Sequence, residues 1–385
     1  KEESNLSGLI RNGSSGAEKA QAEKSGYPHF MLKEIHEQPR ALRNTMRDRI
    51  KDNRVDFSDS KLEEFFADVN KIFIVGCGTA YHAGLIGKHV IEKLARIPVE
   101  VEVSSEFGYR EVLWPDGSVL IVVSQSGETA ETLAILRETQ KCGIKVLAIV
   151  NAVDSSMARE ANAVLYTGAG PEIAIASTKA YSAQVLLMYL IGLFLADMQA
   201  SLKPTVIEEM LKELVALPEK IELFLEGVSR VEAIANKYHG ISNTFVLGRG
   251  LDSMVAREGT LKLKETTYIH AESYPAGELK HGPLALIEEG VLVITLITQD
   301  DLKDRMKSSI EAIRNRQGSV IGIVKEDLTE TVAECDEVIA IPAVSQVFTP
   351  LLAVIPLQLL AYYMAVARGC EVDSPRGLTK AVTVE

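Results

Sequence analysis

The chain has 385 residues, which is enough for two or three domains that each bury a core. Hydrophobic residues make up 46% and charged residues 24%, a balance that excludes disordered, collagen-like and low-complexity proteins. The 41 Lys and Arg are outnumbered by 53 Asp and Glu, and the net charge of −12 disfavours a nucleic acid or an anionic membrane as partner. We therefore expect a small ligand.

The cysteines and the longest apolar runs indicate the compartment. The four cysteines are widely spaced and form no C-x-x-C pair, which fits a reduced, cytoplasmic protein. The apolar runs 185–196 and 350–367 are predicted to be buried helices rather than membrane spans. The sequence shows no secretory signal, and it starts with Lys1 instead of Met, which we interpret as a sign of an excised or processed chain.

Alternating strands and helices predict an α/β protein. Residues 1–26 are polar and rich in Gly and Ser, and we expect a linker there. The first domain is predicted over 27–202, beginning with two helices separated at Pro39. Apolar strands are predicted at 71–75, 119–123 and 145–150, with helices between them, as in a parallel sheet that is covered on both faces.

The second half repeats the plan of the first. The strand and glycine turn at 244–250 match those at 72–78, and the apolar strand at 291–295 follows its glycine at the same distance as the strand at 119–123. This internal repeat predicts two tandem flavodoxin-like parallel-sheet domains with helices on both faces. We place the second domain at 203–370 and a C-terminal tail, folded over the active site, at 371–385.

The sequence SQSGET at 124–129 is the strongest local motif. It lies between a parallel strand and a helix, where backbone N–H groups, the helix dipole and three hydroxyls together favour a phosphate monoester. The alternative is that Ser and Thr only cap the helix. The equivalent loop at 296–300 lacks the hydroxyl and glycine arrangement and adds an aspartate, which favours a phosphate role for 124–129.

Two further patterns concern cofactors. The glycine turn at 76–78 lacks the third glycine of a dinucleotide fingerprint, because Tyr81 stands there, so we predict no NAD. His270 and His281 lie near carboxylates but without zinc-ligand spacing, and we predict neither a metal nor any other cofactor.

A second chemical cluster is predicted on one helix. If 253–267 is helical, Glu258, Lys262 and Glu265 share one face and could transfer protons. The alternative is a solvated Glu–Lys pair of little energetic weight. His281, in a loop bounded by Gly and Pro, could act as an acid or base. Lys380, in the tail, matters only if the tail folds back over a site.

Taken together, these motifs resemble one family. Residues 77–79, 124–129, 176–180, 261–265, 276–285 and the ending from 375 to 385 are similar to the isomerase half of the glutamine:fructose-6-phosphate amidotransferases, which consists of two sugar-isomerase domains. Residues 26–39 look like the segment that joins the glutaminase half of these enzymes to this half.

The resemblance implies a role for each matching residue. Lys380 forms a Schiff base with fructose 6-phosphate, Glu265 moves a proton between C1 and C2 beside Lys262, and His281 from the other subunit of a homodimer opens the sugar ring. It also implies a substrate-binding set that comprises Thr79, Ser124, Gln125, Ser126, Thr129, Ala176 and Ser177. With ammonia the product is glucosamine 6-phosphate, and without it glucose 6-phosphate.

The sequence also departs from the family pattern. Ala80 replaces a serine that normally touches the sugar, and Gly377 and Thr379 replace Asn and Ala in the tail. The glutaminase domain with its cysteine nucleophile is missing, so we expect this chain to depend on ammonia from elsewhere. Two alternatives stay open: a glucosamine-6-phosphate deaminase of the same fold, and a non-catalytic sugar-phosphate sensor.

Overall fold

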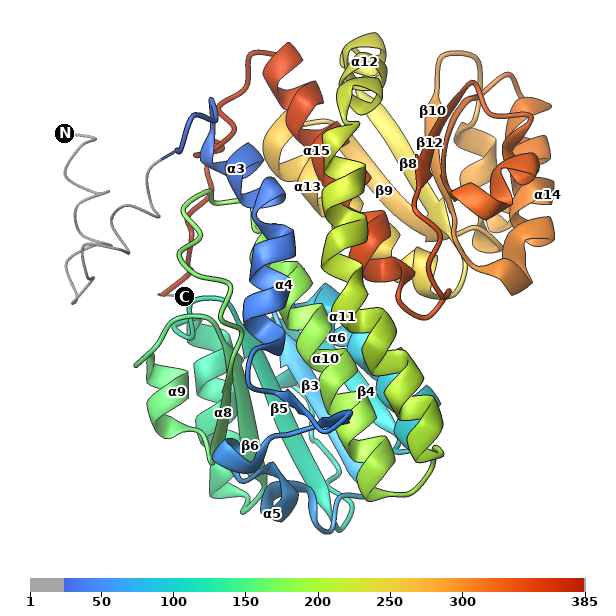
Figure 1. Cartoon of the computed structure of the whole chain (residues 1–385). Helices are drawn as coiled ribbons and strands as arrows, with labels where there is room; N and C mark the ends of the chain where they lie inside the picture. Colours follow the sequence, from blue (N-terminus) through green and yellow to red (C-terminus); the bar gives the residue numbers. More distant parts are fainter. Residues whose placement is uncertain (1–23, 384–385) are drawn as a thin grey trace.

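The computed structural model describes residues 24–383 and has two α/β domains, one above the other in Figure 1. Most of the predicted linker at 1–26 therefore lies outside the described residues. The first domain contains one five-stranded sheet and the second another, and all strand pairs in both sheets are parallel. The predicted fold class is confirmed.

The first sheet has the strand order β4-β3-β5-β6-β7, which is the flavodoxin-like order 2-1-3-4-5. Its central strands are almost wholly buried, as expected of strands covered on both faces. The strands are β3 (Lys71–Gly76), β4 (Val99–Val103), β5 (Ser118–Ser124), β6 (Lys145–Val150) and β7 (Ala163–Tyr166). Strands β4 and β7 were not predicted, because both are short edge strands, and β4 alternates Val with Glu.

The second sheet repeats this order as β12-β11-β10-β8-β9. Its strands are β8 (Asn243–Gly248), β9 (His270–Pro275), β10 (Leu292–Ile297), β11 (Ser319–Lys325) and β12 (Glu337–Ile341). The internal repeat found in the sequence is thus a repeat of topology. In each domain the order in which strands are added to the sheet changes direction between the first and third strands, which are β3 and β5 in one domain and β8 and β10 in the other. This switch point leaves a crevice at the carboxyl ends of the strands.

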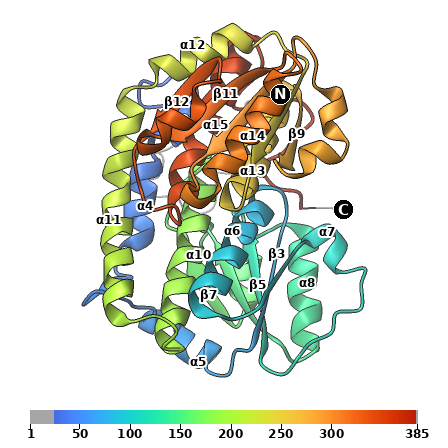
Figure 2. The same ribbon diagram turned by 90° about the vertical axis from the view of Figure 1, so that its right-hand side faces the viewer.

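Helices cover both sheets (Figures 1 and 2). Those up to the end of the first domain are α3 (Phe30–His36), α4 (Gln38–Met46), α5 (Leu62–Phe66), α6 (Thr79–Ala95), α7 (Ser104–Phe107), α8 (Ala130–Lys141), α9 (Ser156–Glu160) and α10 (Lys179–Met198). Those that follow are α11 (Pro204–Glu226), α12 (Ser229–Tyr238), α13 (Leu251–Thr267), α14 (Lys303–Arg314) and α15 (Thr349–Ala367). Short elements are the β1–β2 ladder (Ile50–Lys51 with Arg54–Val55) and the 3-10 turns Ser58–Ser60, Glu278–His281, Pro283–Leu286, Asp300–Leu302 and Glu326–Val332. Pro39 lies in the first turn of α4, where its missing N–H costs nothing.

Two long apolar helices form the centre of the molecule. By length and composition α10 and α15 could each cross a membrane, but 89% and 83% of their most apolar windows are buried inside the protein. Helix α10 packs on α6 and α15 packs on α13, while α6 and α13 contact each other across the domain boundary. One hydrophobic cluster runs from Met31 to Val372 through both domains, so the two domains share a core.

Glycines at the ends of the first strands set the positions of α6 and α13. A Cβ on Gly248 would lie 2.4 Å from the backbone carbon of Asp252, in the first turn of α13. A Cβ on Gly76 would lie 3.0 Å from backbone atoms in the first turn of α6. These glycines therefore let each helix start directly against its strand, and this brings the helix N-termini to the crevice.

We expect Gly248→Ala to destabilise the protein, because the atoms it would meet are backbone atoms that cannot move aside. The free energy of unfolding, measured by urea denaturation, should fall by about 2 kcal/mol, as in other overpacked sites. Gly240→Ala is the matched control, since a Cβ there has nothing within 4 Å. Equal stability of the two variants would contradict this account of the strand-to-helix turn.

Candidate active site

The predicted phosphate loop lies at the switch point of the first sheet, between β5 and α8. Its hydroxyls are tied to the loop itself: the Gly127 N–H donates to Ser124 Oγ over 3.0 Å, and the Glu128 N–H donates to Ser126 Oγ over 3.2 Å. Ser124 Oγ and Thr129 Oγ1 are 3.1 Å apart. Thr129 is the N-cap residue of α8, yet its side chain caps no backbone N–H. Helix capping therefore does not explain the hydroxyls of this loop.

Close packing against the next loop fixes this conformation. Gly127 has φ +65°, and a Cβ there would lie 2.1 Å from Ser155 Oγ, so only glycine fits. The carbonyl of Gln125 accepts the N–H groups of Asn151 and Ala152, 3.1 and 3.2 Å away. The loop is held in place before any ligand arrives.

Glu258, Lys262 and Glu265 form the predicted row on one face of α13, called the α13 row below, and this row is largely buried. Lys262 Nζ lies 3.3 Å from Glu258 Oε1 and 2.6 Å from Glu265 Oε2. The side chains of Glu258 and Lys262 are 0% exposed, whereas Glu265 retains 20% exposure. Burial alone would lower the pKa of Lys262, but the two carboxylates outweigh it and raise that pKa. The alternative of a solvated Glu–Lys pair is therefore wrong.

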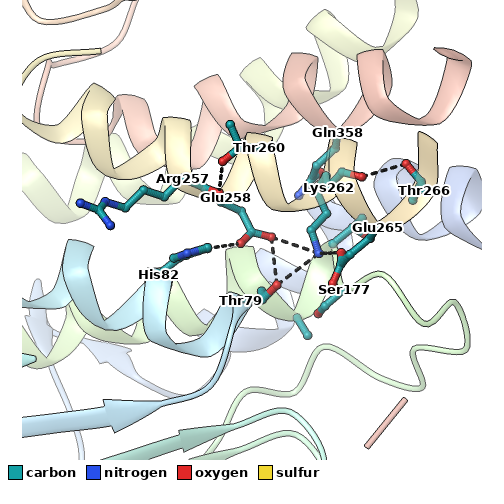
Figure 3. Close-up of polar contacts among 12 residues, drawn as sticks. Thr79, His82, Ser177, Arg257, Glu258, Thr260, Lys262, Glu265, Thr266 and Gln358 are labelled. Atoms are coloured by element: carbon teal, nitrogen blue, oxygen red, sulfur yellow. Dashed lines mark hydrogen bonds and ion pairs between the residues drawn. The ribbon is translucent and has the colours of Figure 1, made fainter. Parts of the chain in front are cut away.

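The first domain completes this row (Figure 3). Thr79, at the start of α6, donates its hydroxyl to Glu258 Oε1 over 3.1 Å and accepts a hydrogen bond from Lys262 over 3.2 Å. His82 Nδ1 lies 2.8 Å from Glu258 Oε2. Thr79 was a predicted site residue, but His82 and Glu258 as a pair were missed. The pair is formed between domains, and no sequence spacing encodes it.

The C-terminal tail folds back onto the first domain. The N–H of Ala130, in the first turn of α8, donates to the carbonyl of Val382 over 3.1 Å, so the tail lies beside the phosphate loop. Asp373 accepts the N–H groups of Phe30 and Met31, both at 2.9 Å, and thereby caps α3. Lys380 is consequently only 15% exposed, instead of solvated as a terminal lysine would be by default.

Lys380 contacts two groups that the sequence analysis did not single out. Its Nζ lies 2.7 Å from Glu172 Oε2 and 2.6 Å from the carbonyl oxygen of Ala174. Ser177 donates its hydroxyl to the same Glu172 oxygen over 2.8 Å. Glu172 stands in the irregular segment before α10, which has no periodic pattern, so the sequence held no signal for this contact.

A second buried carboxyl lies next to Glu172. Glu34, on α3, accepts the N–H of Ile173 over 2.6 Å. Burial and the charge of Glu172 raise the pKa of Glu34 to about 8. Burial alone would raise the pKa of Glu172 as well. The Lys380 ammonium and the N–H groups of Thr178 and Ala180 outweigh burial and lower that pKa to about 2. Near neutral pH one carboxyl is protonated and its neighbour is ionised.

The remaining predicted residues make none of the polar contacts described above. Ala176 is buried, whereas His281 is exposed at the end of the 3-10 turn Glu278–His281. Gly377 has φ +74°, a conformation in which glycine is unstrained and Asn is the usual substitute, so the Asn-to-Gly departure is compatible with this turn. Ala80 is buried in the first turn of α6, close to Gly76.

The equivalent edge of the second domain is filled by the protein itself. Asp252, fully buried in the first turn of α13, accepts the N–H of Thr298 over 2.8 Å and the hydroxyl of the same residue. By the strand registers of the two sheets Thr298 corresponds to Gln125, and Asp252 corresponds to Ala80. Burial raises the pKa of Asp252 to about 6, against these hydrogen bonds. A carboxylate of the protein itself thus accepts hydrogen bonds from the loop of the second domain.

Comparison with known proteins agrees with this architecture. The family model described as SIS domain matches residues 65–193 and 238–368. The glutamine–fructose-6-phosphate aminotransferase [isomerizing] of Caldanaerobacter subterraneus is 52% identical over 94% of this chain, and the chain spans 60% of the length of that relative. A Clostridium tetani protein of the same name is also 52% identical.

Solved structures extend the comparison. The C-terminal domain of glucosamine-fructose-6-phosphate aminotransferase from Francisella tularensis has a TM-score of 0.89 and 38% identity, covering 92% of this chain and 100% of that one. The glucosamine-6-phosphate deaminase from Thermotoga maritima has a TM-score of 0.72 at 24% identity, covering 92% of this chain and 99% of that one, and shares the fold. The chain therefore belongs to the SIS-domain family and, within it, to the group of the C-terminal isomerase domains of these aminotransferases.

We expect Glu34→Gln to remove a pH dependence from stability. Between pH about 4.5 and 8 the Glu34 carboxyl is protonated when folded and ionised when unfolded, so unfolding releases a proton. The free energy of unfolding should then fall as pH rises, by up to about 1.4 kcal/mol per pH unit. Gln cannot ionise, so the variant should lack this slope. Urea denaturation from pH 5 to 8 measures it, and parallel curves for wild type and variant would contradict the assignment.

Proposed function

We propose that this chain is the sugar-isomerase part of a glutamine:fructose-6-phosphate amidotransferase. In this proposal it converts fructose 6-phosphate to glucosamine 6-phosphate when ammonia is supplied, and to glucose 6-phosphate when it is not. The observation that supports it most directly is the convergence of three elements, the phosphate loop, the α13 row and the tail with Lys380, around the switch point of the first sheet. The relatives that carry this name support the substrate class.

Substrate binding in this proposal begins with the phosphate. Ser124, Gln125, Ser126 and Thr129 provide hydroxyl, amide and backbone donors at the N-terminus of α8, whose dipole favours an anion. Thr79, Ala176 and Ser177 then line the sugar. They lie at the start of α6 and just before α10.

The chemistry follows from an amine and a carboxylate. The Lys380 amine attacks C2 of the open-chain ketose and water leaves, which gives an imine and makes the C1 protons more acidic. Glu265, the least buried member of the α13 row, takes a proton from C1 and returns it to C2. The Lys262 ammonium stabilises the negative charge of Glu265 over their 2.6 Å contact. In the synthesis, ammonia adds to C2 while it is still an imine carbon and the lysine leaves as the free amine, so this exchange precedes the proton transfer to C2.

Two parts of the proposal lie outside this one chain. His281 is exposed and faces solvent, which suits a residue that acts in the site of a second subunit and opens the sugar ring there. The nitrogen would come from a glutaminase domain, in keeping with the 60% of each relative's length that this chain spans. A cytoplasmic homodimer is the assembly we propose.

The deciding experiment is to incubate the purified chain with fructose 6-phosphate, with and without ammonium, and to follow both hexose products. Glucose 6-phosphate without ammonium supports the isomerase, and glucosamine 6-phosphate with ammonium supports the synthase. Release of ammonia from glucosamine 6-phosphate, with no synthesis, would favour a deaminase. Binding of fructose 6-phosphate without any product would favour a sensor.

Lys380→Ala and Glu265→Gln should separate chemistry from binding. Each variant should lose at least about 100-fold in turnover, the scale of one acid–base or nucleophilic group. The dissociation constant for fructose 6-phosphate, measured by calorimetry, should change little because the phosphate loop is intact. Exposed Lys307→Ala is the control. Full turnover in either variant would refute the mechanism.

Ser126→Ala should show the opposite behaviour. Loss of one hydroxyl from the loop should weaken binding of fructose 6-phosphate by about tenfold, the equivalent of one hydrogen bond to a charged group. Binding of unphosphorylated fructose should not change. Ser308→Ala, an exposed serine on α14, is the matched control. Unchanged affinity for the phosphorylated sugar would refute the phosphate site.

A further inference from the structure

Lys380, the lysine of the proposed mechanism, makes its polar contacts away from the α13 row. The amine of Lys380 is held by Glu172 and by the carbonyl of Ala174, at 2.7 and 2.6 Å. We propose that Glu172 is the positioning residue for Lys380, holding the amine of the tail as an ammonium ion beside the sugar site until the ketose arrives. This inference rests on the proposed function for its purpose, and on the geometry alone for the contact.

The carboxylate of Glu172 is held in one position by burial and by hydrogen bonds to both of its oxygens. Its side chain is 0% exposed, and one oxygen accepts the N–H groups of Thr178 and Ala180, at 2.9 and 3.1 Å. These N–H groups belong to the start of α10, whose dipole also stabilises a carboxylate. The other oxygen accepts Ser177 and Lys380. The carboxylate cannot follow the lysine when the lysine moves.

The surrounding charges single out Glu172 as the anchor. Glu34 is adjacent, but its pKa of about 8 leaves it neutral at pH 7. Lys179, on α10, is paired instead with Glu37, the residue between α3 and α4, at 2.6 Å. At neutral pH the negative charge in contact with Lys380 is therefore that of Glu172.

This contact has a chemical cost for the enzyme. An ammonium ion has no lone pair, so Lys380 must leave Glu172 and lose a proton before it can attack C2. Removing the carboxylate removes the anchor of the amine. The position and the reactivity of the amine should then change together, which distinguishes this role from one in folding alone.

The test is competitive acetylation of the whole chain with trace acetic anhydride across pH 6 to 11, read by peptide mass spectrometry. In Glu172→Gln the acetylation of Lys380 should exceed that of wild type throughout this range, because the carboxylate no longer holds the amine. Exposed Lys307 serves as the internal standard. Glu37→Gln, which removes a carboxylate from buried Lys179 instead, is the matched control and should leave the Lys380 curve in place.

Reductive trapping of fructose 6-phosphate with cyanoborohydride separates this inference from the proposed function. If wild type gives a Lys380 adduct and Glu172→Gln matches wild type in both acetylation and trapping, the positioning role is wrong. If acetylation shifts but wild type gives no adduct, the positioning role stands and the Schiff base fails. Glu172→Asp, which keeps the charge but shortens the side chain, should trap at least about fivefold less adduct without shifting the acetylation curve. Wild-type trapping by this variant would also overturn the role, even if the Gln variant does not fold.

Discussion

The positive charge of Lys262, enclosed between two domains, is the constraint on which the rest of the structure depends. Moving an ammonium ion out of water costs several kcal/mol unless partners surround it. Here Glu258 and Glu265 come from the same helix, but Thr79 comes from the other domain. Helices α6 and α13 must therefore dock in one register, because a shift of either would leave a buried charge without its partner. The apolar helices α10 and α15 provide the surface for docking, and the charged row selects its register.

The same requirement places the candidate active site. The predicted phosphate loop lies at the switch point of the first sheet, and the docking of α13 on α6 leaves Glu265 at the domain boundary with 20% of its side chain exposed. The C-terminal tail packs against the same region, since Asp373 caps α3 and the carbonyl of Val382 accepts the N–H of Ala130 in the first turn of α8. Residues separated by up to 343 positions thus meet because the tail is hydrogen-bonded to helices of the first half of the chain.

Periodic and local features could be predicted from the sequence, and long-range polar contacts could not. Buried strands such as β3 and β5, the internal repeat, the glycine turns and the α13 row all follow from spacing, and all are present. Glu172, Glu34 and His82 have partners 208, 139 and 176 positions away, in Lys380, Ile173 and Glu258. No local pattern distinguishes such a residue from a surface one. The roles of Lys380 and His281 came from a family resemblance and stay predictions.

The carboxylate of Asp252 has an evolutionary consequence. A chain that arises by duplication starts with two equivalent crevices, and a second crevice that still bound sugar phosphate would withhold substrate from the first without converting it. Asp252 accepts both the N–H and the hydroxyl of Thr298, so the loop of the second copy already has an internal hydrogen-bond partner. In the proposed function the second domain is thereby relieved of binding, and helix α13, its equivalent of α6, provides acid–base groups to the first domain. In this account one copy of the fold keeps the proposed binding loop, and the other fills its loop with its own carboxylate and contributes side chains to the first.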